Sequence, residues 1–489
     1  MASGFSAFLE DARLTVQALR DFGSHLVHPT VRLGVTGLSR AGKTVFITAL
    51  VHGLVRGGRF PVFESLATGR IARARLEPQP DDAIPRFDYE RHLRALIDER
   101  RWPDSTTDIS ELRLAVDYQS RGGAERTLVI DIVDYPGEWL LDLPLLETSY
   151  EQWSAQSLAL SHSGPRARLA ADWHAHLALL RPLAPADEQE VLTAARLFTA
   201  YLKACRDERF AMSTLPPGRF LLPGAMAGTP AVTFAPLKVS AGDEPPAGSL
   251  WAMMRRRFES YKSAIVRPFF REHFARLDRQ IVLVDALAAF NAGPAALHDL
   301  EAAMAAILDC FRVGRRTLLS ALIRPRIDRI LFAATKADHL HHASHDRLEA
   351  VLKEMMREAL DRAGTTGAIT DAIAIAAVRA TREAEVKQGR GRLPAIVGTP
   401  VAGETSGSDT FDGETDIATF PGDLPENVEA LFKDGAAFQG LSAAPATQAD
   451  FRFMRFRPPV LETDASGKPA LPHIRLDRAL QFLIGDRLT

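Results

Sequence analysis

The chain has 489 residues, of which 46% are hydrophobic and 25% are charged, so it can bury a large core with insertions or form two to three domains. Its 59 lysine and arginine residues nearly balance 61 aspartate and glutamate residues, which argues against a global field that would draw it to nucleic acid or an anionic membrane. The two cysteines, Cys205 and Cys310, have neither metal-ligand nor disulfide-framework spacing. Because we find no signal peptide and no run of roughly 20 apolar residues, we expect a cytoplasmic protein.

The first predicted elements are a helix, a strand and a second helix. Apolar positions at helical spacing predict a helix over residues 5–22, and a short apolar run predicts a buried strand over residues 31–36. A loop follows, and the strongly apolar stretch over residues 45–55 predicts a helix that ends before Gly57 and Gly58. The local order is therefore strand, loop, helix.

Five further aliphatic runs predict strands. Residues 112–118 and 128–133 are separated by Gly122 and Gly123, which is typical of a hairpin. Three later runs are separated by helical patterns and lie at residues 281–285, 330–334 and 373–378. Continuous apolar runs suit parallel strands that are covered on both faces. We therefore predict an α/β fold with an open, mostly parallel sheet that contains one antiparallel strand.

The spacing of these strands divides the chain. About 140 residues separate the third strand from the fourth, far more than a crossover needs. We therefore predict a mainly helical insertion subdomain over residues 140–278, whose last helix, over 250–277, is kinked or split at Pro268. The sheet domain would comprise residues 1–139 and 279–389. The remaining residues, 390–489, would form a C-terminal appendage with loops over 390–425, a strand over 451–456 and a final helix over 476–488.

The loop after the first strand has the pattern Gly-x-x-x-x-Gly-Lys-Thr over residues 37–44. With a strand before it and a helix after it, its backbone amides and the positive end of the helix can cradle phosphates. Lys43 would reach the β and γ phosphates, and the Thr44 hydroxyl would bind Mg²⁺. The residues predicted to bind nucleotide here are Ser39, Arg40, Ala41, Gly42, Lys43, Thr44 and Val45.

The third strand runs into the sequence Asp-Tyr-Pro-Gly. Asp134 ends this strand, where its carboxylate would bind a water molecule on Mg²⁺, and the amide of Gly137 would sense a γ-phosphate. Asp131 is an alternative metal carboxylate, but the residue just before the turn is better placed.

The fifth strand runs into the sequence Thr-Lys-Ala-Asp. A carboxylate at Asp338 can accept two hydrogen bonds from N1 and N2 of guanine, a donor pair that adenine lacks. Lys336 would lie along the plane of the base, and His339 would lie beside it. This turn is the chief evidence for guanine over adenine.

The three motifs occur in the order and strand context of Ras-like GTPases. The chain resembles the YcjX-like family of stress-associated P-loop proteins through GLSRAGKT, RWPDSTTDISELRL, DYPGEWLLDLP, LVDALAAFNAG, TKADHL and the final LPHIRLDRALQFLIGD. The resemblance covers nearly the full length and implies a Ras-like P-loop NTPase fold. It also suggests a stress-response setting and a protein partner at or near the membrane. Such proteins are described as GTPases and as ATPases, so the resemblance leaves the nucleotide open.

The resemblance also implies a first switch. Residues 101–107, RWPDSTT, lie where GTPases keep this segment, and Thr106 or Thr107 is the candidate Mg²⁺ contact. Spacing does not choose between the two threonines, and we assign Thr107 to catalysis and to the metal. Trp102 would cover the nucleotide or belong to the core, and Ser105 is counted with the nucleotide-binding residues.

Glu138 occupies the position where small GTPases hold a water-orienting glutamine. A glutamate would orient or deprotonate the attacking water, but its charge opposes the γ-phosphate, which predicts slow intrinsic hydrolysis. Arg40 would add positive charge to the transition state or point to solvent. The residues assigned to catalysis are Lys43, Thr107, Asp134 and Glu138, and those assigned to Mg²⁺ are Thr44, Thr107 and Asp134.

Two looser patterns follow the fifth and sixth strands. Near guanine O6, the backbone amide of Ala380 and the side chain of Arg379 are equally favoured as base contacts. Four histidines follow the Thr-Lys-Ala-Asp turn without acidic or cysteine partners, which favours a solvated helix start over a metal site; they are His339, His341, His342 and His345.

We therefore expect an Mg²⁺-dependent protein that binds GTP or GDP and hydrolyses GTP slowly, as a switch in a bacterial stress response. It would be cytoplasmic, at most peripheral to the inner membrane, and would not bind nucleic acid. One alternative is an ATPase that uses the same loop. Another is a nucleotide-controlled interaction protein with negligible hydrolysis, which acts through residues 140–278.

Overall fold

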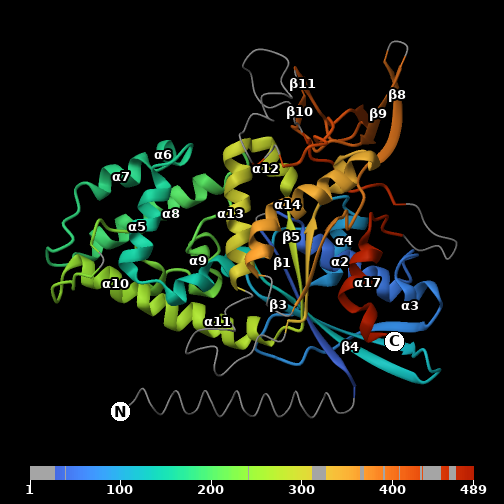
Figure 1. Ribbon diagram of the computed structural model, residues 1–489, viewed down its shortest axis with the longest axis horizontal. Helices are drawn as coiled ribbons and strands as arrows, with labels where there is room; N and C mark the ends of the chain where they lie inside the picture. Colours follow the sequence, from blue (N-terminus) through green and yellow to red (C-terminus); the bar gives the residue numbers. More distant parts are fainter. Residues whose placement is uncertain are drawn as a thin grey trace.

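The computed structural model describes residues 28–310, 327–363, 368–388, 391–429, 432, 453–461 and 470–489, apart from residues 39, 241 and 407. The helix predicted over residues 5–22 lies outside this range. Figure 1 shows a central sheet with helices on both sides, and the helices between β4 and β5 extend to the left of the sheet.

The sheet has seven strands in the order β2-β3-β4-β1-β5-β6-β7. Their bounds are β1 Thr30–Gly37, β2 Ile71–Glu77, β3 Ser110–Gln119, β4 Glu125–Asp134, β5 Arg279–Val284, β6 Arg329–Ala334 and β7 Ile369–Ala374. β3 pairs antiparallel with β2 and β4, whereas β1 pairs parallel with β4 and β5, and β6 pairs parallel with β5 and β7. The predicted mostly parallel sheet with one antiparallel strand is confirmed.

Two strands differ from the prediction. β2, an edge strand in which apolar and charged residues alternate, was not predicted. It pairs with β3 through the backbone, and Arg73 and Arg75 add ion pairs to Asp117. β7 begins at Ile369, four residues before the predicted start. Its first residues are polar or exposed because β7 is the other edge of the sheet, so the aliphatic run marks only its buried end.

The two faces of the sheet pack against different sets of helices. Alternate strand residues such as Leu33 and Ile281 face one core, which also receives α2 (Lys43–Arg56), α4 (Tyr89–Ile97) and α17 (Leu476–Ile484). Residues such as Val282 face a larger core with α13 (Pro294–Cys310) and α14 (His345–Ala363). The short helices α3 (Glu64–Ala67) and α12 (Ala286–Ala292) complete this part.

The segment between β4 and β5 is helical in all its regular elements. Its α-helices are α5 (Tyr150–Ser161), α6 (Arg166–Leu169), α7 (Ala171–Leu177), α8 (Glu188–Arg206), α9 (Gly218–Leu221), α10 (Leu250–Tyr261) and α11 (Arg267–Glu272). One π-helical turn, Lys262–Val266, separates α10 from α11, just before Pro268 in the first turn of α11. The helices of the insertion share the larger core with α13, so the insertion is packed against the sheet domain. No helix within the described ranges is long and apolar enough to span a bilayer.

The C-terminal part contains more strand than predicted. β8 (Arg382–Gln388), β9 (Gly391–Gly398) and β12 (Ile417–Thr419) form a small antiparallel sheet, and β10 (Thr405–Ser406) pairs with β11 (Asp409–Thr410). Of the predicted strand over 451–456, the four described residues make only an isolated bridge, from Phe456 to Pro400. The final helix α17 packs into the core of the central sheet and therefore belongs physically with the sheet rather than with an appendage.

Candidate nucleotide-binding site

A pocket of roughly 450 Å³ lies at the carboxyl ends of the parallel strands, where open α/β sheets bind ligands. The pocket is lined by the loop after β1, the segment before β3, the turn after β6, the end of α8 and the C-terminal segment. The side chains that line it include Lys43, Thr44, Trp102, Thr106, Glu138, Arg206, Lys336, Asp338 and Phe456.

The loop between β1 and α2 is tightly folded. Gly42 adopts a left-handed φ of 80°, and the amide of Ala41 donates to the carbonyl of Leu38 at 3.0 Å. The Lys43 Nζ donates to the carbonyl of Gly37 at 3.4 Å, so its ammonium folds back over the loop. Arg40, Ala41, Gly42 and Val45 also line the pocket, and Ser39 lies outside the described residues. Loop amides and the start of α2 therefore face one cavity, as an anion site requires.

Three oxygen-bearing side chains meet beside this loop. The Thr44 and Thr106 hydroxyls are 3.2 Å apart, and the Thr106 hydroxyl donates to Asp134 Oδ2 at 2.7 Å. Asp134 Oδ1 is buried and has no hydrogen-bond partner among the described residues. Burial raises the pKa of Asp134 to about 6, and this effect outweighs the lowering influences of Lys43 and of the Thr106 hydroxyl. Hydroxyl and carboxylate oxygens are the ligands that Mg²⁺ prefers, so these residues fit the cation.

The neighbouring candidates are separated by the structure. Thr107 is exposed, and we find no contact between it and Asp134; Thr106 is the threonine that reaches Thr44. The role predicted for Thr107 at the metal therefore suits Thr106 better, because the Thr106 hydroxyl contacts both Thr44 and Asp134 whereas Thr107 is exposed. Asp131 is occupied elsewhere, since Arg113 binds both of its carboxylate oxygens, at 2.6 and 2.8 Å.

The first-switch segment closes the pocket with an indole. Trp102 is half-buried, and its Nε1 donates to the carbonyl of Phe456 at 2.6 Å. Ser105 also lines the pocket. The C-terminal segment therefore fixes the orientation of Trp102, which covers the cavity and at the same time packs against the core.

Glu138 is buried next to the loop after β1. The backbone of the preceding Gly137 lies against the loop, because a Cβ there would be 2.5 Å from the Gly37 carbonyl oxygen. Arg206, the last residue of α8, places a guanidinium nitrogen 3.1 Å from Glu138 Oε1. Arg40 forms an ion pair with Glu208, so this loop arginine is held against the insertion.

The residues predicted to contact the base are bound to each other or to neighbouring residues. Asp338 is 4% exposed, and its Oδ2 accepts a hydrogen bond from the amide of Ala380 at 2.8 Å. The Lys336 Nζ donates to Asp285 at 2.5 Å, at the end of β5. His339 is buried, its ring lies edge-on to the ring of Phe456, and burial lowers its pKa. Carboxylate and amide, one acceptor and one donor, thus stand side by side.

Arg379 does not take part in this arrangement. Its Nε donates to the carbonyl of Thr381 at 2.9 Å, and its guanidinium lies 3.6 Å from Glu383. The side chain therefore points along the chain toward β8 and does not line the pocket. Of the two residues, neither of which lines the pocket, only Ala380 contacts Asp338, through its backbone amide.

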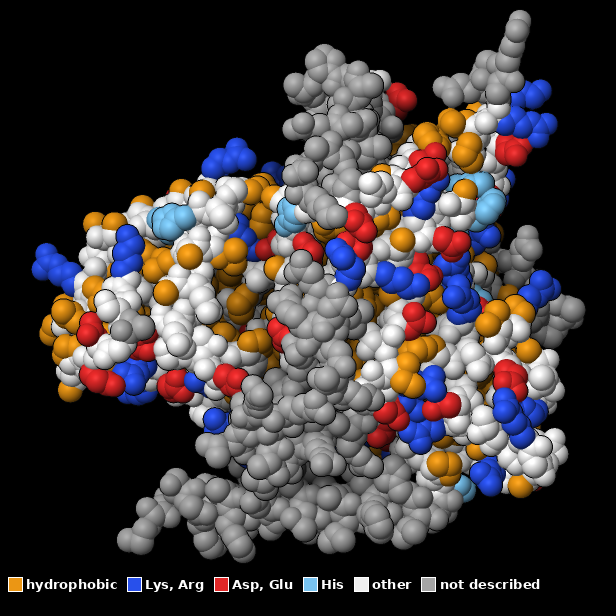
Figure 2. Space-filling model, viewed as in Figure 1, with side chains coloured by type: hydrophobic (Ala, Val, Ile, Leu, Met, Phe, Trp, Pro, Cys, Tyr) orange, Lys and Arg blue, Asp and Glu red, His pale blue; other side chains and the backbone are white. Residues whose placement is uncertain are grey.

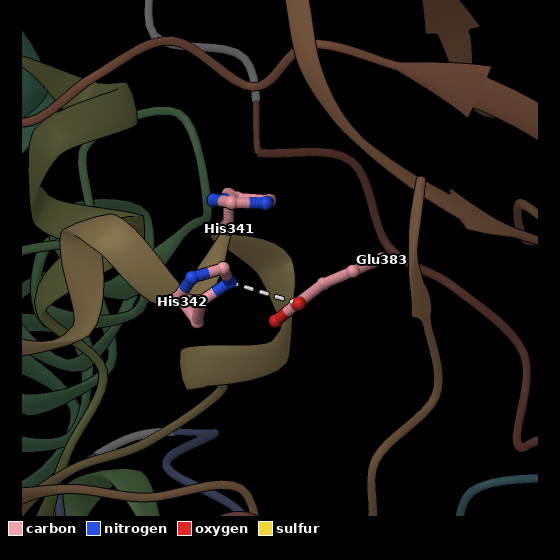
Figure 3. Close-up of side chains that lie close together, drawn as sticks. All are labelled: His341, His342 and Glu383. Atoms are coloured by element: carbon pink, nitrogen blue, oxygen red, sulfur yellow. Dashed lines mark hydrogen bonds and ion pairs between the residues drawn. The ribbon is translucent and has the colours of Figure 1, made fainter. Parts of the chain in front are cut away.

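The histidines after this turn gain an acidic neighbour that the sequence did not indicate. Figure 3 shows Glu383, from the start of β8, beside His341 and His342, and His342 Nδ1 lies 2.9 Å from Glu383 Oε2. His341 Nδ1 accepts from the Ala343 amide, which leaves the proton on the other nitrogen, and Arg379 adds positive charge beside Glu383. The cluster is therefore better described as a hydrogen bond from His342 to Glu383 that links β8 to the segment after β6.

Sequence reasoning missed the residues that the insertion and the C-terminal segment bring to the pocket. They are Arg206, Leu222, Glu208, Val401, Arg455 and Phe456. No local pattern marks them, because each is placed by packing between segments distant in sequence. On the face drawn in Figure 2, acidic and basic side chains lie interspersed.

A parallel sheet with one antiparallel strand, a phosphate-type loop after β1 and carboxylates after β4 and β6 together define the Ras-like class of α/β fold. The comparisons agree with this class. The chain matches the YcjX-like family, DUF463, over residues 31–488. It is 39% identical to "Ras-like GTPase YcjX" of Escherichia coli (strain K12), over 94% of this chain and 96% of that protein. It is 35% identical to "Ras-like GTPase YcjX" of Shewanella oneidensis, over 95% and 96%.

The chain therefore belongs to the YcjX-like family. The relatives' names support a GTPase-like, nucleoside-triphosphatase function in general.

Proposed function

We propose that this protein binds GTP and GDP with Mg²⁺ and hydrolyses GTP slowly, as a switch. The observation that carries the proposal is that one pocket, lined by Thr44, Thr106 and Asp338, adjoins both an oxygen cluster and a paired carboxylate and amide. The cluster is Thr44, Thr106 and Asp134, and the pair is Asp338 with Ala380. The cluster would hold the triphosphate of a nucleotide, and the pair would bind its guanine base.

At the phosphate end, Lys43 and the loop amides would bind the β and γ phosphates. Thr44 and Thr106 would hold Mg²⁺ through their hydroxyls, and Asp134 would hold it directly or through a water molecule. When bound, the cation would neutralise charge on the phosphate oxygens. Lys43 partly opposes the effect of burial on the pKa of Asp134, and a bound cation would favour the ionised carboxylate further.

At the base end, guanine would replace the mutual hydrogen bond between Asp338 and Ala380. Its N1 and N2 donors would bind the carboxylate, and its O6 would accept from the freed amide. Adenine offers neither this donor pair nor an acceptor at the same place, so it would leave both groups unpaired in a buried site. The proposal therefore favours GTP over ATP.

Slow turnover follows from the charge at Glu138. The carboxylate is buried beside the loop, where a γ-phosphate would meet it, so part of the electrostatic stabilisation of the transition state is lost. Two further expectations rest on the family resemblance: a role in a bacterial stress response, and a protein partner near the inner membrane.

Competition binding tests the nucleotide. We expect unlabelled GTP to displace a fluorescent guanine nucleotide at least about 100-fold more effectively than ATP. Asp338→Asn should lower GTP affinity by a similar factor and raise the affinity for xanthosine triphosphate, whose base presents a carbonyl where guanine has its amino group. Asp371→Asn, at an exposed aspartate in β7, is the matched control. Equal displacement by ATP and GTP would instead favour the ATPase alternative.

A second candidate, a nucleotide-controlled interaction protein, is favoured by the contact between Glu138 and Arg206 of the insertion. Tight nucleotide binding with hydrolysis near zero would support that reading.

A further inference from the structure

We propose that Arg206, on the helical insertion, is a catalytic residue whose guanidinium contacts the γ-phosphate and is shared between that phosphate and Glu138. This inference rests on the proposed GTP hydrolysis and adds to it a residue that neither the sequence motifs nor the relatives' names assign. The insertion would then supply in the same chain a positive charge that other switch proteins receive from a partner.

Arg206 lies at the phosphate end of the pocket. It lines the same cavity as Lys43 and Thr106, and its guanidinium is 3.1 Å from Glu138. Glu138 directly follows Gly137, whose backbone touches the carbonyl of Gly37 in the phosphate loop. The guanidinium is therefore within side-chain reach of the place where the loop would hold the terminal phosphate.

The ion pair between Arg206 and Glu138 is compatible with a guanidinium that also contacts a phosphate. The Glu138 side chain is 5% exposed and the Arg206 side chain 24%, so the pair is screened little by water. Neither carboxylate oxygen of Glu138 has a hydrogen-bond partner among the described residues, so the interaction with Arg206 is an ion pair without ideal hydrogen-bond geometry. A guanidinium has five N–H donors, which allows it to bind a phosphate while it stays near the carboxylate.

The insertion packs against the segment after β4 that contains Glu138, the residue that Arg206 contacts. The backbone of Gly218 touches Glu138, since a Cβ at Gly218 would lie 2.2 Å from the Glu138 carbonyl oxygen. Asp142, in the 3₁₀ helix Gly137–Glu147, accepts from the amide of Gly218 at 2.7 Å. Preorganised charge of this kind stabilises a transition state without reorganisation. Arg40 is less suited to the role because its side chain is 52% exposed and pairs with the exposed Glu208.

In the hydrolytic step, the oxygen of a water molecule bonds to the γ-phosphorus as the bond from this phosphorus to the β–γ bridging oxygen breaks. The electron pair leaves with GDP, and the proton of the water passes to the released phosphate. Negative charge builds on the γ-phosphoryl and bridging oxygens, which are the atoms that Arg206 would contact.

Single-turnover hydrolysis and binding of a transition-state analogue test this proposal on the full chain. Arg206→Ala should slow GTP hydrolysis by about 10³-fold while GDP affinity stays within about threefold, because GDP lacks the γ-phosphate. The same variant should lose fluoride- and aluminium-dependent tightening of GDP, read from tryptophan fluorescence. Arg206→Lys should recover only part of both effects, because a lysine lacks the planar fork.

Arg209→Ala is the matched control, since Arg209 follows α8 and its side chain is 80% exposed. Arg206→Ala with unchanged hydrolysis and unchanged analogue binding would overturn the proposal, even if its melting temperature fell, because Arg206 would then only hold Glu138. If the wild type binds no guanine nucleotide, the proposed function fails first. If the wild type binds GDP but shows neither hydrolysis nor fluoride-dependent tightening, the role of Arg206 fails while nucleotide binding stands.

Discussion

The floor and the walls of the pocket are built in different ways. The floor comes from three short segments, each at the end of a β-strand, in which the functional residue and the strand that positions it are neighbours in sequence. The walls come from α8 in the insertion and from residues 453–456 near the C-terminus, which reach the pocket through packing alone. The residues of the floor are therefore placed by local sequence, whereas those of the walls are placed by tertiary packing.

The difference is greatest where floor and wall meet, at Glu138 and Arg206. A buried carboxylate is unfavourable by itself, and neither oxygen of Glu138 has a hydrogen-bond partner among the described residues. The compensating charge comes from the insertion. Variants that act on the wall, on the floor and on the seam between them can separate these contributions.

The largest effect is expected at Asp142, which ties the insertion to the floor. Its carboxylate accepts from the amide of Gly218 and from the Tyr261 hydroxyl, at 2.7 and 2.5 Å. Burial raises the pKa of Asp142 from 3.8 to about 6. A raised pKa in the folded state contributes stability below pH 4 that is lost as the pH rises through 6, by up to about 3 kcal/mol.

Asp142→Asn should remove this dependence. The difference in free energy of unfolding, variant minus wild type, should therefore increase between pH 4 and pH 7. Urea denaturation at both pH values measures the gain. Asp172→Asn, at an exposed aspartate of α7, should show none. A constant difference between wild type and Asp142→Asn across this range would contradict the raised pKa.

A smaller effect is expected in the segment before β3, from two adjacent threonines. Thr106→Ala should weaken Mg²⁺-dependent GTP binding at least about tenfold, because Thr106 contacts both Thr44 and Asp134. Thr107→Ala should change it less than about threefold. Calorimetric titration of GTP with and without Mg²⁺ gives both values. An effect of Thr107→Ala as large as that of Thr106→Ala would mean that the segment rearranges on binding.

The smallest effect is expected at the seam. Glu138→Gln removes one buried negative charge beside the γ-phosphate, so the preference for GTP over GDP should rise several-fold, or about 1 kcal/mol. The ratio of the two dissociation constants measures the preference, and Glu147→Gln, at the exposed end of the same 3₁₀ helix, is the control. A preference that falls would show that Glu138 helps to bind GTP.

The sequence predicts the floor well because the signal is local. Six of the seven sheet strands follow from aliphatic runs, and their ends place Thr44, Asp134 and Asp338 at one edge of the sheet. The polar edges were harder to predict, since β2 and the start of β7 carry too few apolar residues to stand out. The antiparallel pair β8 and β9 lies partly in a segment read as loop because its residues are mostly polar or small.

The walls could not be predicted in the same way. Nothing in the spacing around Arg206 distinguishes it from the solvated arginines of an amphipathic helix, and its importance appears only when α8 is packed beside Glu138. The sequence could not choose between Thr106 and Thr107 for the same reason, because the choice depends on how an irregular segment orients its side chains.

A crystal structure of the full chain with GDP, Mg²⁺ and aluminium fluoride would test the central claim, that floor and insertion form one guanine-nucleotide site. The account predicts guanine on the carboxylate of Asp338, Mg²⁺ bound by Thr44 and Thr106, and the guanidinium of Arg206 within hydrogen-bond distance of the fluoride. A nucleotide bound outside this pocket, or a base that does not contact Asp338, would contradict it.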